Sequence, residues 1–380
     1  MIFYIILSII VFIIVAYMIY KVKYGYWSRQ PVFHYHNIFY WYNPPGVIEK
    51  GDVEISKYYN AQIEFIESDK ISTEKKELFA TLLKSHFMPY KGEKYAPTTE
   101  GIMNSFQSHD RPSYIGLNYD KNTLISTLST IPIHIFFDGN KQEIYYADFL
   151  CVHPRYRKQG IAQRIINTVQ TNHRLKDAPH KRETSILFKR EGKSMLIVPL
   201  MIYKNYVFDI SCWDKNVNFN EHPFIQLVKL TKQTSNFLLE LLNKCVYKFK
   251  CVIMQNIGHL LYLCEKSELT ITILLVNKQA VGFYVFRDPY ITYNKNKSVE
   301  MIASYNDNTT NEIFSLGFLS SIKHLNQNTK RVLMTDSGHN NIILNIILKK
   351  YKIITVLMAS FYFYNYATRP LMSYDVLSLV

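Results

Sequence analysis

The segment from Glu143 to Gln170, EIYYADFLCVHPRYRKQGIAQRIINTVQ, constrains the fold more than any other part of the chain. An apolar strand runs into FLCV, a short basic turn with the sequence RKQGIA follows, and a helix begins at that turn. Backbone N–H groups exposed in such a turn and in the first turn of a helix bind phosphate. The segment therefore predicts a site for a ligand that carries a pyrophosphate.

The basic turn suits a pyrophosphate in two ways. Its small residues, Gly160 and Ala162, let the backbone approach the phosphates, and the side chains of Arg157 and Lys158 neutralise their charge. The helix that follows has one apolar face, which consists of Ile161, Ile165, Ile166 and Val169. The alternative is a basic, solvated helix start that contains a glycine by coincidence.

The turn resembles the R/Q-x-x-G-x-G/A loop of the GCN5-related acyltransferases (GNAT superfamily), which bind coenzyme A. Together with FLCVH ahead of it, the turn is similar to the signature of the N-myristoyltransferases, two-lobed members that acylate an N-terminal glycine. Further similarities follow the chain in order: YGYWSRQPV from Tyr24, IS and IPIHI from Ile125, YNY from Tyr364, and the final VLSLV. The resemblance implies an α+β fold of two GCN5-related acyltransferase-like lobes in tandem. In this chain the lobes are preceded by one transmembrane helix, which is predicted from the hydropathy of the first residues.

The resemblance also implies roles for particular residues. The backbone N–H groups of Phe149 and Leu150 would form an oxyanion hole for the thioester carbonyl, and the C-terminal carboxylate of Val380 would be the base. The apolar end of the chain agrees with a buried terminus. Coenzyme A would be bound by Tyr24, Tyr26, Trp27, Cys151, Val152, Arg157, Lys158, Gln159, Gly160, Ile161 and Ala162.

The chain departs from the family pattern at three places, two on the peptide side and one beside the predicted oxyanion hole. The family's acidic loop is replaced by FMPYKGEK at Phe87–Lys94, and its Trp-His stretch is not recognisable around Lys193–Tyr203. Asp148 stands where the family usually has asparagine, and its carboxylate would oppose negative charge that develops beside it. The acyl-CoA side is thus retained, whereas the peptide side is rebuilt.

The first twenty residues, MIFYIILSIIVFIIVAYMIY, contain no charge and are long enough as a helix to cross a bilayer. They predict an uncleaved anchor, with a cleaved secretory signal as the alternative. Basic residues follow at Lys21, Lys23 and Arg29, so the positive-inside rule predicts a single-pass membrane protein with a cytosolic C-terminal body. Five cysteines without CxxC spacing agree with a reducing compartment.

Composition limits the remaining partners. The net charge of +14 is scattered rather than clustered, which favours a polyanionic small molecule or a membrane over nucleic acid. No metal is expected, because His34 and His36 have no third ligand in view and His339 lies in a polar turn. Frequent Asn, Ile, Lys and Tyr indicate an AT-rich genome, and with the anchor they favour a large DNA virus as the source.

The pattern of elements predicts a duplicated α+β unit. We expect an anchor at 1–20, a first lobe with the acyl-CoA site at 21–215, and a second lobe with the peptide side and the C-terminal carboxylate at 216–380. Helices are expected at 55–83, 98–106, 224–245 and 312–324. Strands are expected at 122–129, 131–137, 143–152, 185–188, 195–203, 207–210, 270–276, 280–286, 332–334, 353–357 and 361–366. Hairpin turns are expected at Asp138-Gly139-Asn140 and around Asn277-Lys278.

Three functions remain open. The first is transfer of myristoyl from myristoyl-CoA, the acyl donor, to the N-terminal glycine amine of a protein, by direct attack without a covalent enzyme intermediate. The second is an inactive membrane protein that binds acyl-CoA or a myristoylated peptide. The third is acylation of lysine or a small amine on the same scaffold. The retained RKQGIA turn favours an enzyme, and the altered peptide side favours the second possibility.

Overall fold

The structure is a computed structural model that describes residues 2–23, 25–87, 93–176, 183–211, 213, 224–293, 296–323, 325 and 329–380. Its α-helices are α1 Ile2–Lys23, α2 Ile38–Tyr42, α3 Thr73–His86, α4 Thr99–Asn104, α5 Ile161–Lys176, α6 Ser235–Lys248, α7 Ile257–Glu265, α8 Asn311–Ile322 and α9 Asn340–Lys350. Short 3-10 helices are η1 Trp27–Arg29, η2 Pro154–Tyr156, η5 Lys232–Thr234 and η6 Ser373–Asp375. The strands of the N-terminal half are β1 Gly46–Val47, β2 Glu64–Glu67, β3 Glu93–Tyr95, β4 Tyr114–Asp120, β5 Thr123–Phe137, β6 Asn140–Val152, β7 Ile186–Glu191 and β8 Met201–Asp209. Those of the C-terminal half are β9 Ile225–Lys229, β10 Cys251–Met254, β11 Leu269–Val276, β12 Gln279–Arg287, β13 Ile291–Tyr293, β14 Asn296–Asn306, β15 Thr329–Thr335, β16 Ile353–Tyr364, β17 Tyr366–Ala367 and β18 Val376–Ser378.

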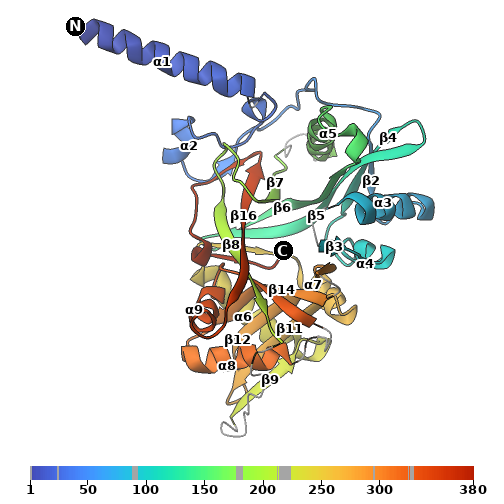
Figure 1. The fold of residues 1–380 in the computed structure, drawn as a ribbon, viewed down its shortest axis with the longest axis vertical. Helices are drawn as coiled ribbons and strands as arrows, with labels where there is room; N and C mark the ends of the chain where they lie inside the picture. The colour runs from blue at the N-terminus through green and yellow to red at the C-terminus, as the bar shows by residue number, and fades with distance from the viewer. Residues whose placement is uncertain are drawn as a thin grey trace.

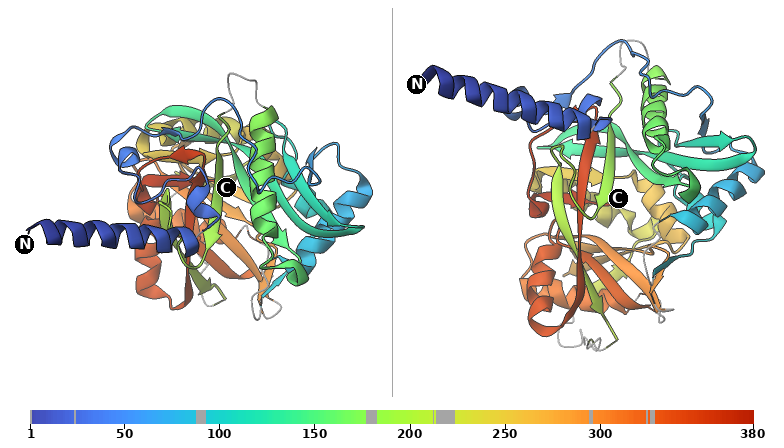
Figure 2. Two further views of the ribbon diagram at one scale, coloured as in Figure 1. Left: turned by 90° about the horizontal axis from the view of Figure 1, so that it is seen from above. Right: turned by 45° about the horizontal axis from the view of Figure 1, so that its top comes forward.

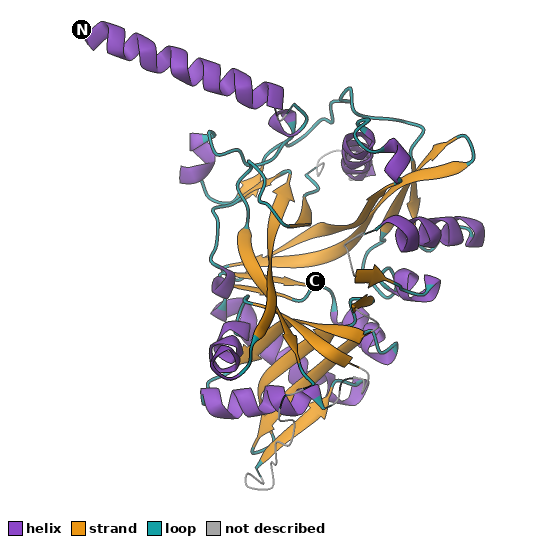
Figure 3. Ribbon diagram, in the orientation of Figure 1, coloured by secondary structure: helices purple, strands orange, loops and turns teal. Residues whose placement is uncertain are grey.

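Sixteen of the described strands form one continuous mixed sheet that runs through both halves of the molecule (Figure 3). Its main path has the order β18-β10-β5-β6-β7-β16-β8-β15-β14-β12-β11-β9. In the upper lobe of Figure 1, α5 and α3 pack on opposite faces of β4, β5 and β6. In the lower lobe, α6 and α8 pack against β12, and α9 packs against α8. The fold is therefore two α+β lobes joined by a shared sheet.

The end of the chain returns to the first lobe. β16 lies between β7 and β8, and β18 pairs with β10, which in turn pairs with β5. The C-terminus consequently lies in the middle of the molecule, between the lobes (Figure 1). The predicted boundary at 215/216 lies outside the described residues, and β8, the strand before it, pairs with β15 and β16 of the C-terminal half.

Local turn signals were read correctly from the sequence. The hairpin β5–β6 turns at Asp138 (φ 46°) and Gly139 (φ 85°), and the hairpin β11–β12 turns at Asn277 (φ 51°) and Lys278 (φ 67°). Two positive φ values in a two-residue turn match the right-handed twist of the flanking strands. Both predicted hairpins are confirmed.

Several predicted elements are wrong in kind or extent. Residues 55–83 are not one helix: β2 pairs with β4, and α3 begins only after Ser72, whose hydroxyl accepts from the N–H of Lys75. Residues 224–245 likewise contain β9, which pairs with β11, ahead of α6. Strand pairing between distant residues overrides the helical pattern in both cases. The two strands predicted at 122–137 are the single strand β5, those at 353–366 are chiefly β16, and residues 195–200 precede the strand expected there.

Helix α1 projects from the body in all views (Figure 2). Its segment Ile2–Val22 has a mean hydropathy of 3.0 and none of it is buried, so it is a candidate membrane span. At its base, the hydroxyl of Tyr20 lies 2.8 Å from Nδ1 of His34, and the rings of His34 and His36 stack at 5.2 Å. The two histidines thus pack against the helix, and the described residues contain no group of three metal-ligating side chains.

Candidate active site

The basic turn connects η2 to α5, as the sequence predicts. Lys158 (φ 64°) and Gly160 (φ 78°) both adopt left-handed backbone conformations. A Cβ atom at Gly160 would meet nothing within 4 Å, so the turn requires glycine for its backbone angle rather than for space. The side chains of Lys158 and Gln159 are exposed beside the start of the helix. The turn therefore presents backbone N–H groups and a cation at one surface.

Arg157 has a structural role in addition to its charge. Its Nε donates to the carbonyl of Val152 at 3.0 Å, and its Nη2 donates to the carbonyl of His86 at 3.2 Å. The side chain thereby ties the end of β6 to the end of α3, and it holds the basic turn against the first lobe.

Helix α5 is fixed through the apolar face read from the sequence. Ile165 and Val169 are fully buried, while Ile161 and Ile166 are half-buried. The helix approaches β4 so closely at Gly116 that a Cβ there would lie 2.8 Å from Cγ2 of Val169. Gly116 therefore sets how near the N-terminus of α5 lies to the sheet.

Strand β6 contains a β-bulge at the residues expected to form an oxyanion hole. Ser129 of β5 pairs with Asp148 and Thr127 pairs with Cys151, so Phe149 and Leu150 together oppose one residue. Phe149 has φ 52°, and its ring packs in the core against Phe79, Phe87 and Phe106, whereas the Leu150 side chain is 40% exposed. The bulge reorients the backbone where the family resemblance places the donors.

The sheet splits next to this bulge. The last pair between β6 and β7 is Ala147 with Phe188, and β7 continues along β16 to the pair of Glu191 with Ala359. Asp148 and Lys189 are therefore the first residues beyond the point where the two strands separate. We call the space between the diverging strands the β6/β7 split.

Asp148 turns its carboxylate to the bulge. Its Oδ1 accepts from the backbone N–H of Phe149 at 2.7 Å, and its own carbonyl accepts from the Ser129 hydroxyl at 3.0 Å. Burial raises the pKa of this carboxyl, although the Phe149 N–H, Arg287 and Lys189 act in the opposite direction. The sequence predicted that the Asp148 carboxylate would oppose negative charge that develops beside it. In the structure this carboxylate is hydrogen-bonded to one of the two donors of the predicted oxyanion hole.

An ionic cluster, which we define as Lys189, Glu191, Arg287 and Glu300, lies beside the β6/β7 split; Glu300 is buried, Lys189 and Arg287 are partly buried, and Glu191 is exposed. Arg287 Nη2 is 2.7 Å from Glu300 Oε2, and Lys189 Nζ is 3.2 Å from Glu191 and 3.9 Å from Glu300. Burial favours a protonated Glu300, but Arg287 and Lys189 outweigh it and lower the pKa of Glu300 to about 2. The Glu300 carboxylate is therefore ionised at neutral pH.

Sequence analysis missed this ionic cluster. Its members come from β7, β12 and β14, and some of them are more than a hundred residues apart in the sequence. The available signal was the presence of charged residues within apolar strands, as in ILFKRE, AVGFYVFR and SVEMIAS.

The C-terminal residue lies inside the molecule. Val380 is 8% exposed, and the preceding Leu379 donates its N–H to the carbonyl of Ile253 at 2.8 Å. A narrow cavity of about 10 Å³, room for roughly one water molecule, is lined by Val380. Its other lining residues are Lys189, Met201, Tyr203, Glu300, Ile302, Thr335, Ser337, Phe361 and Ser378. The terminus and the ionic cluster thus share one cavity.

The aromatic segment after the anchor packs on a side chain of β7. The ring of Trp27 stacks on Phe188 with a centroid distance of 5.7 Å, next to the β6/β7 split. Tyr26 is buried between Trp27 and Tyr58, so its ring packs against protein rather than facing solvent. Tyr24, also expected to bind coenzyme A, lies outside the described residues, as does most of the loop from Phe87 to Lys94.

Cys151 and Val152 end β6 above the bulge. Cys151 is 3% exposed, and burial raises the pKa of its thiol to about 11. The thiol is therefore protonated at neutral pH and is a poor nucleophile. Val152 is half-buried and supplies the carbonyl that Arg157 holds.

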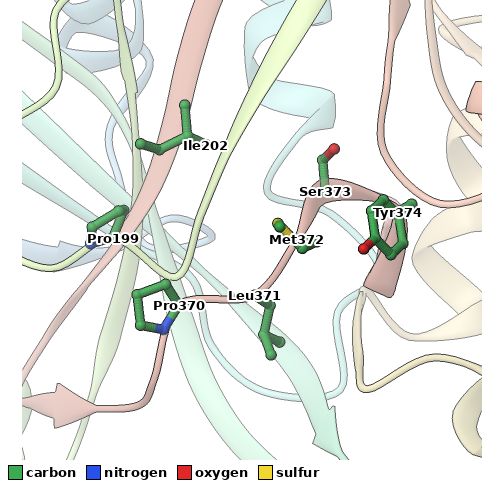
Figure 4. Close-up of a pocket in the computed structure, with 7 residues that line it drawn as sticks. All are labelled: Pro199, Ile202, Pro370, Leu371, Met372, Ser373 and Tyr374. Carbon is green, nitrogen blue, oxygen red and sulfur yellow. The ribbon is translucent and has the colours of Figure 1, made fainter. Parts of the chain in front are cut away.

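A second, more open groove lies elsewhere. It has a volume of about 260 Å³ and is lined by Pro199, Ile202, Pro370, Leu371, Met372, Ser373 and Tyr374 (Figure 4). Ile202 faces the side of β8 opposite to Met201 and Tyr203, since successive side chains of a strand alternate. The groove therefore opens on the other face of the sheet from the cavity at Val380, and it contains no charged side chain.

Comparison with known proteins identifies the class of the first lobe. Residues 78–182, which span α3 to α5 and include the bulge and the basic turn, match the Acetyltransferase (GNAT) family. A search of curated proteins found no significant match.

Most of the chain has the fold of N-myristoyltransferase. It superposes on a structure of Saccharomyces cerevisiae N-myristoyltransferase with bound myristoyl-CoA with a TM-score of 0.70 and 13% identity, covering 94% of this chain and 99% of that one. A second structure of the yeast enzyme with myristoyl-CoA gives a TM-score of 0.70, 14% identity and coverages of 93% and 94%. The predicted fold of two acyltransferase-like lobes in tandem is therefore confirmed.

Proposed function

We propose that this protein transfers a myristoyl group from myristoyl-CoA to the N-terminal glycine amine of a protein. The observation that carries the proposal is the β6/β7 split, with the basic turn and the bulge on one side and the buried C-terminus in a cavity on the other. The yeast enzyme with the same fold is described with bound myristoyl-CoA. We assign myristoyl-CoA as the acyl donor and no metal to the reaction.

In this proposal the acyl donor is held at its phosphate end. Backbone N–H groups around Gly160 and the Lys158 ammonium bind the pyrophosphate of coenzyme A. Trp27 covers the split from the side of β7. The remaining proposed contacts are Tyr24, Tyr26, Cys151, Val152, Arg157, Gln159, Ile161 and Ala162. The thioester carbonyl is thereby placed at the bulge.

The chemistry is direct attack of the amine on the thioester carbonyl. The backbone N–H groups of Phe149 and Leu150 stabilise the negative charge that develops on the carbonyl oxygen. The carboxylate of Val380, a residue that belongs to the same hydrophobic core as Phe149, accepts a proton from the nitrogen. No covalent enzyme intermediate is required.

A second function is favoured by one observation. The Asp148 carboxylate already accepts the Phe149 N–H at 2.7 Å, where a substrate carbonyl oxygen would bind. A permanently ionised Asp148 would keep this donor from the thioester, and the protein would then bind acyl-CoA or a myristoylated peptide without turnover.

Transfer of radiolabelled myristoyl separates these functions. The purified chain, given tritiated myristoyl-CoA and peptides that begin in glycine, alanine or an internal-lysine sequence, should label only the glycine peptides. Binding of myristoyl-CoA should weaken at high salt, because the basic turn contacts phosphates through charge. Binding without transfer would support the inactive alternative, and labelling of lysine would indicate a different acyltransferase.

We further propose that α1 anchors the protein in a membrane, with the body on the cytosolic side. The helix is long, apolar and unburied, and basic residues follow it on one side only. Tethering suits a reaction whose donor and product both partition into bilayers. In a flotation assay the full chain should rise with lipid vesicles, whereas a chain lacking residues 2–23 should stay at the bottom. Equal flotation of the two would contradict the anchor.

A further inference from the structure

We propose that Asp148 accepts the first proton from the substrate's glycine ammonium, and that this transfer frees the Phe149 N–H to bind the thioester carbonyl. The inference rests on the proposed function and adds a catalytic residue to it. It also gives the acidic residue beside the bulge a role in the reaction.

The substrate nitrogen loses two protons during the reaction, and the Val380 carboxylate accepts only one of them. An N-terminal amine has a pKa of about 8 and arrives at neutral pH mainly as an ammonium with three N–H bonds. The amide product keeps one N–H bond, so two protons must leave the nitrogen. One must leave before attack, because an ammonium has no lone pair, and the other leaves after attack.

Asp148 occupies the right place for the first transfer. It is the first residue of β6 beyond the last pair with β7, and its side chain is partly exposed where the strands separate. Its Oδ1 lies 2.7 Å from the N–H of Phe149, so any carbonyl oxygen bound to that N–H replaces the carboxylate. A nucleophile that attacks this carbonyl must approach within van der Waals distance of it, and hence of Asp148.

The hydrogen bond couples proton transfer to the oxyanion hole. A backbone N–H is a single donor, and an ionised carboxylate accepts it about twice as strongly as a neutral group does. While Asp148 is ionised, the carboxylate therefore competes with the thioester carbonyl for this N–H. Protonation of Asp148 weakens its hold and leaves the donor to the carbonyl when charge develops there.

The charges around Asp148 favour this exchange. Arg287 faces it from β12, Lys189 and Glu191 from β7, Tyr146 from its own strand and Tyr95 from β3, and Glu300 stands behind Arg287 and Lys189. Arg287 and Lys189 carry two positive charges, and Glu191 and Glu300 two negative charges. Ionised Asp148 thus leaves a net charge of −1, which an entering ammonium neutralises. The same burial that raises the pKa of Asp148 brings it toward that of the amine.

Protons and electrons balance over the whole transfer. The ammonium gives one proton to the Asp148 carboxylate, which yields a neutral amine and a neutral carboxylic acid. The amine lone pair forms the C–N bond, and the carbonyl π electrons move to the oxygen, which the freed N–H stabilises. The oxygen electrons re-form the carbonyl as the C–S bond breaks, coenzyme A leaves as the thiolate, and the second proton passes from nitrogen to Val380.

A binding experiment tests the competition without turnover. The affinity of the full chain for myristoyl-CoA is compared with that for its thioether analogue, which has a methylene in place of the carbonyl, between pH 5 and 9. In the native chain the preference for the carbonyl compound should grow by roughly 10-fold as the pH falls through the pKa of Asp148. In Asp148→Asn the preference should not change with pH. The exposed carboxylate variant Asp69→Asn should behave as the native chain. A preference in the native chain that is independent of pH would overturn the inference.

Kinetics test the proton transfer. For the native chain, kcat/KM for a glycine peptide should rise with pH through the pKa of Asp148. For Asp148→Asn it should be about 100-fold lower at pH 7 and rise up to about pH 8, since the amine must then lose its proton to solvent. Glu191→Gln removes a negative charge that raises the pKa of Asp148, so the acidic limb should shift to lower pH. Transfer by Asp148→Asn with the native profile would overturn this inference alone, whereas no transfer by the native chain would contradict the proposed function as well.

Discussion

A chain extended by a few glycine and serine residues beyond Val380 should lose myristoyl transfer by about 1,000-fold and still bind myristoyl-CoA. A general base contributes roughly 10²- to 10⁴-fold, and the extension replaces the terminal carboxylate with an amide. Val380 is 8% exposed and lines a cavity of about 10 Å³, so the added residues also have no room beside the ionic cluster. The basic turn lies in the first lobe and is untouched. Single-turnover transfer and acyl-CoA titration measure the two effects.

Matched variants separate the carboxylate from the disturbance of packing. The same residues inserted after Gly51, an exposed position with φ 77° where an added Cβ would meet nothing within 4 Å, should leave transfer unchanged. Val380→Leu keeps the carboxylate and should retain most of the activity. Deletion of Val380 moves the carboxylate back by about 3.3 Å and should be nearly as harmful as the extension. Full activity in the extended chain would exclude Val380 as a base.

The part of the site that could be predicted from the sequence is local. The basic turn depends on a glycine with a positive φ and on the helix that follows, and both requirements are met within six residues. The hairpin turns at Asp138–Gly139 and Asn277–Lys278 also depend only on neighbouring residues, which adopt positive φ values. The sequence also singled out Asp148, because it differs from the residue usual in the resembling family.

The part that could not be predicted depends on pairing between distant strands. The residues of β9 and β2 have sequence patterns typical of a helix. They form strands because β9 pairs with β11 and β2 pairs with β4. The ionic cluster exists only because β7 lies near β12 and β14 in the folded chain, and no residue pattern records that proximity. Similarly, the sequence suggested a buried terminus but not that Lys189 and Glu300 would share its cavity.

Glu300→Gln should lower the free energy of unfolding by about 3–5 kcal/mol at pH 7. Glu300 is 6% exposed, and its carboxylate is paired with Arg287 at 2.7 Å and lies 3.9 Å from Lys189. The substitution leaves the guanidinium without its buried counter-charge, which costs more than the loss of the ion pair alone. Urea denaturation followed by tryptophan fluorescence measures the change.

The pH dependence of this effect has a defined sign. The folded state lowers the pKa of Glu300 to about 2, so its contribution to stability is fully present above the ordinary carboxyl range and is lost as pH falls from about 4.5 toward 2. The difference between the native chain and Glu300→Gln should therefore shrink over this interval. As a control, Glu100→Gln removes an exposed ion pair with Lys266 and should have little effect on stability at any pH. The double variant Arg287→Met with Glu300→Met should destabilise the protein less than Glu300→Gln does, because it leaves neither partner of the pair as an unpaired charge. If Glu300→Gln were as mild as Glu100→Gln, Glu300 would not be a buried partner of Arg287 in solution, and the charge balance that we assign to Asp148 would fail with it.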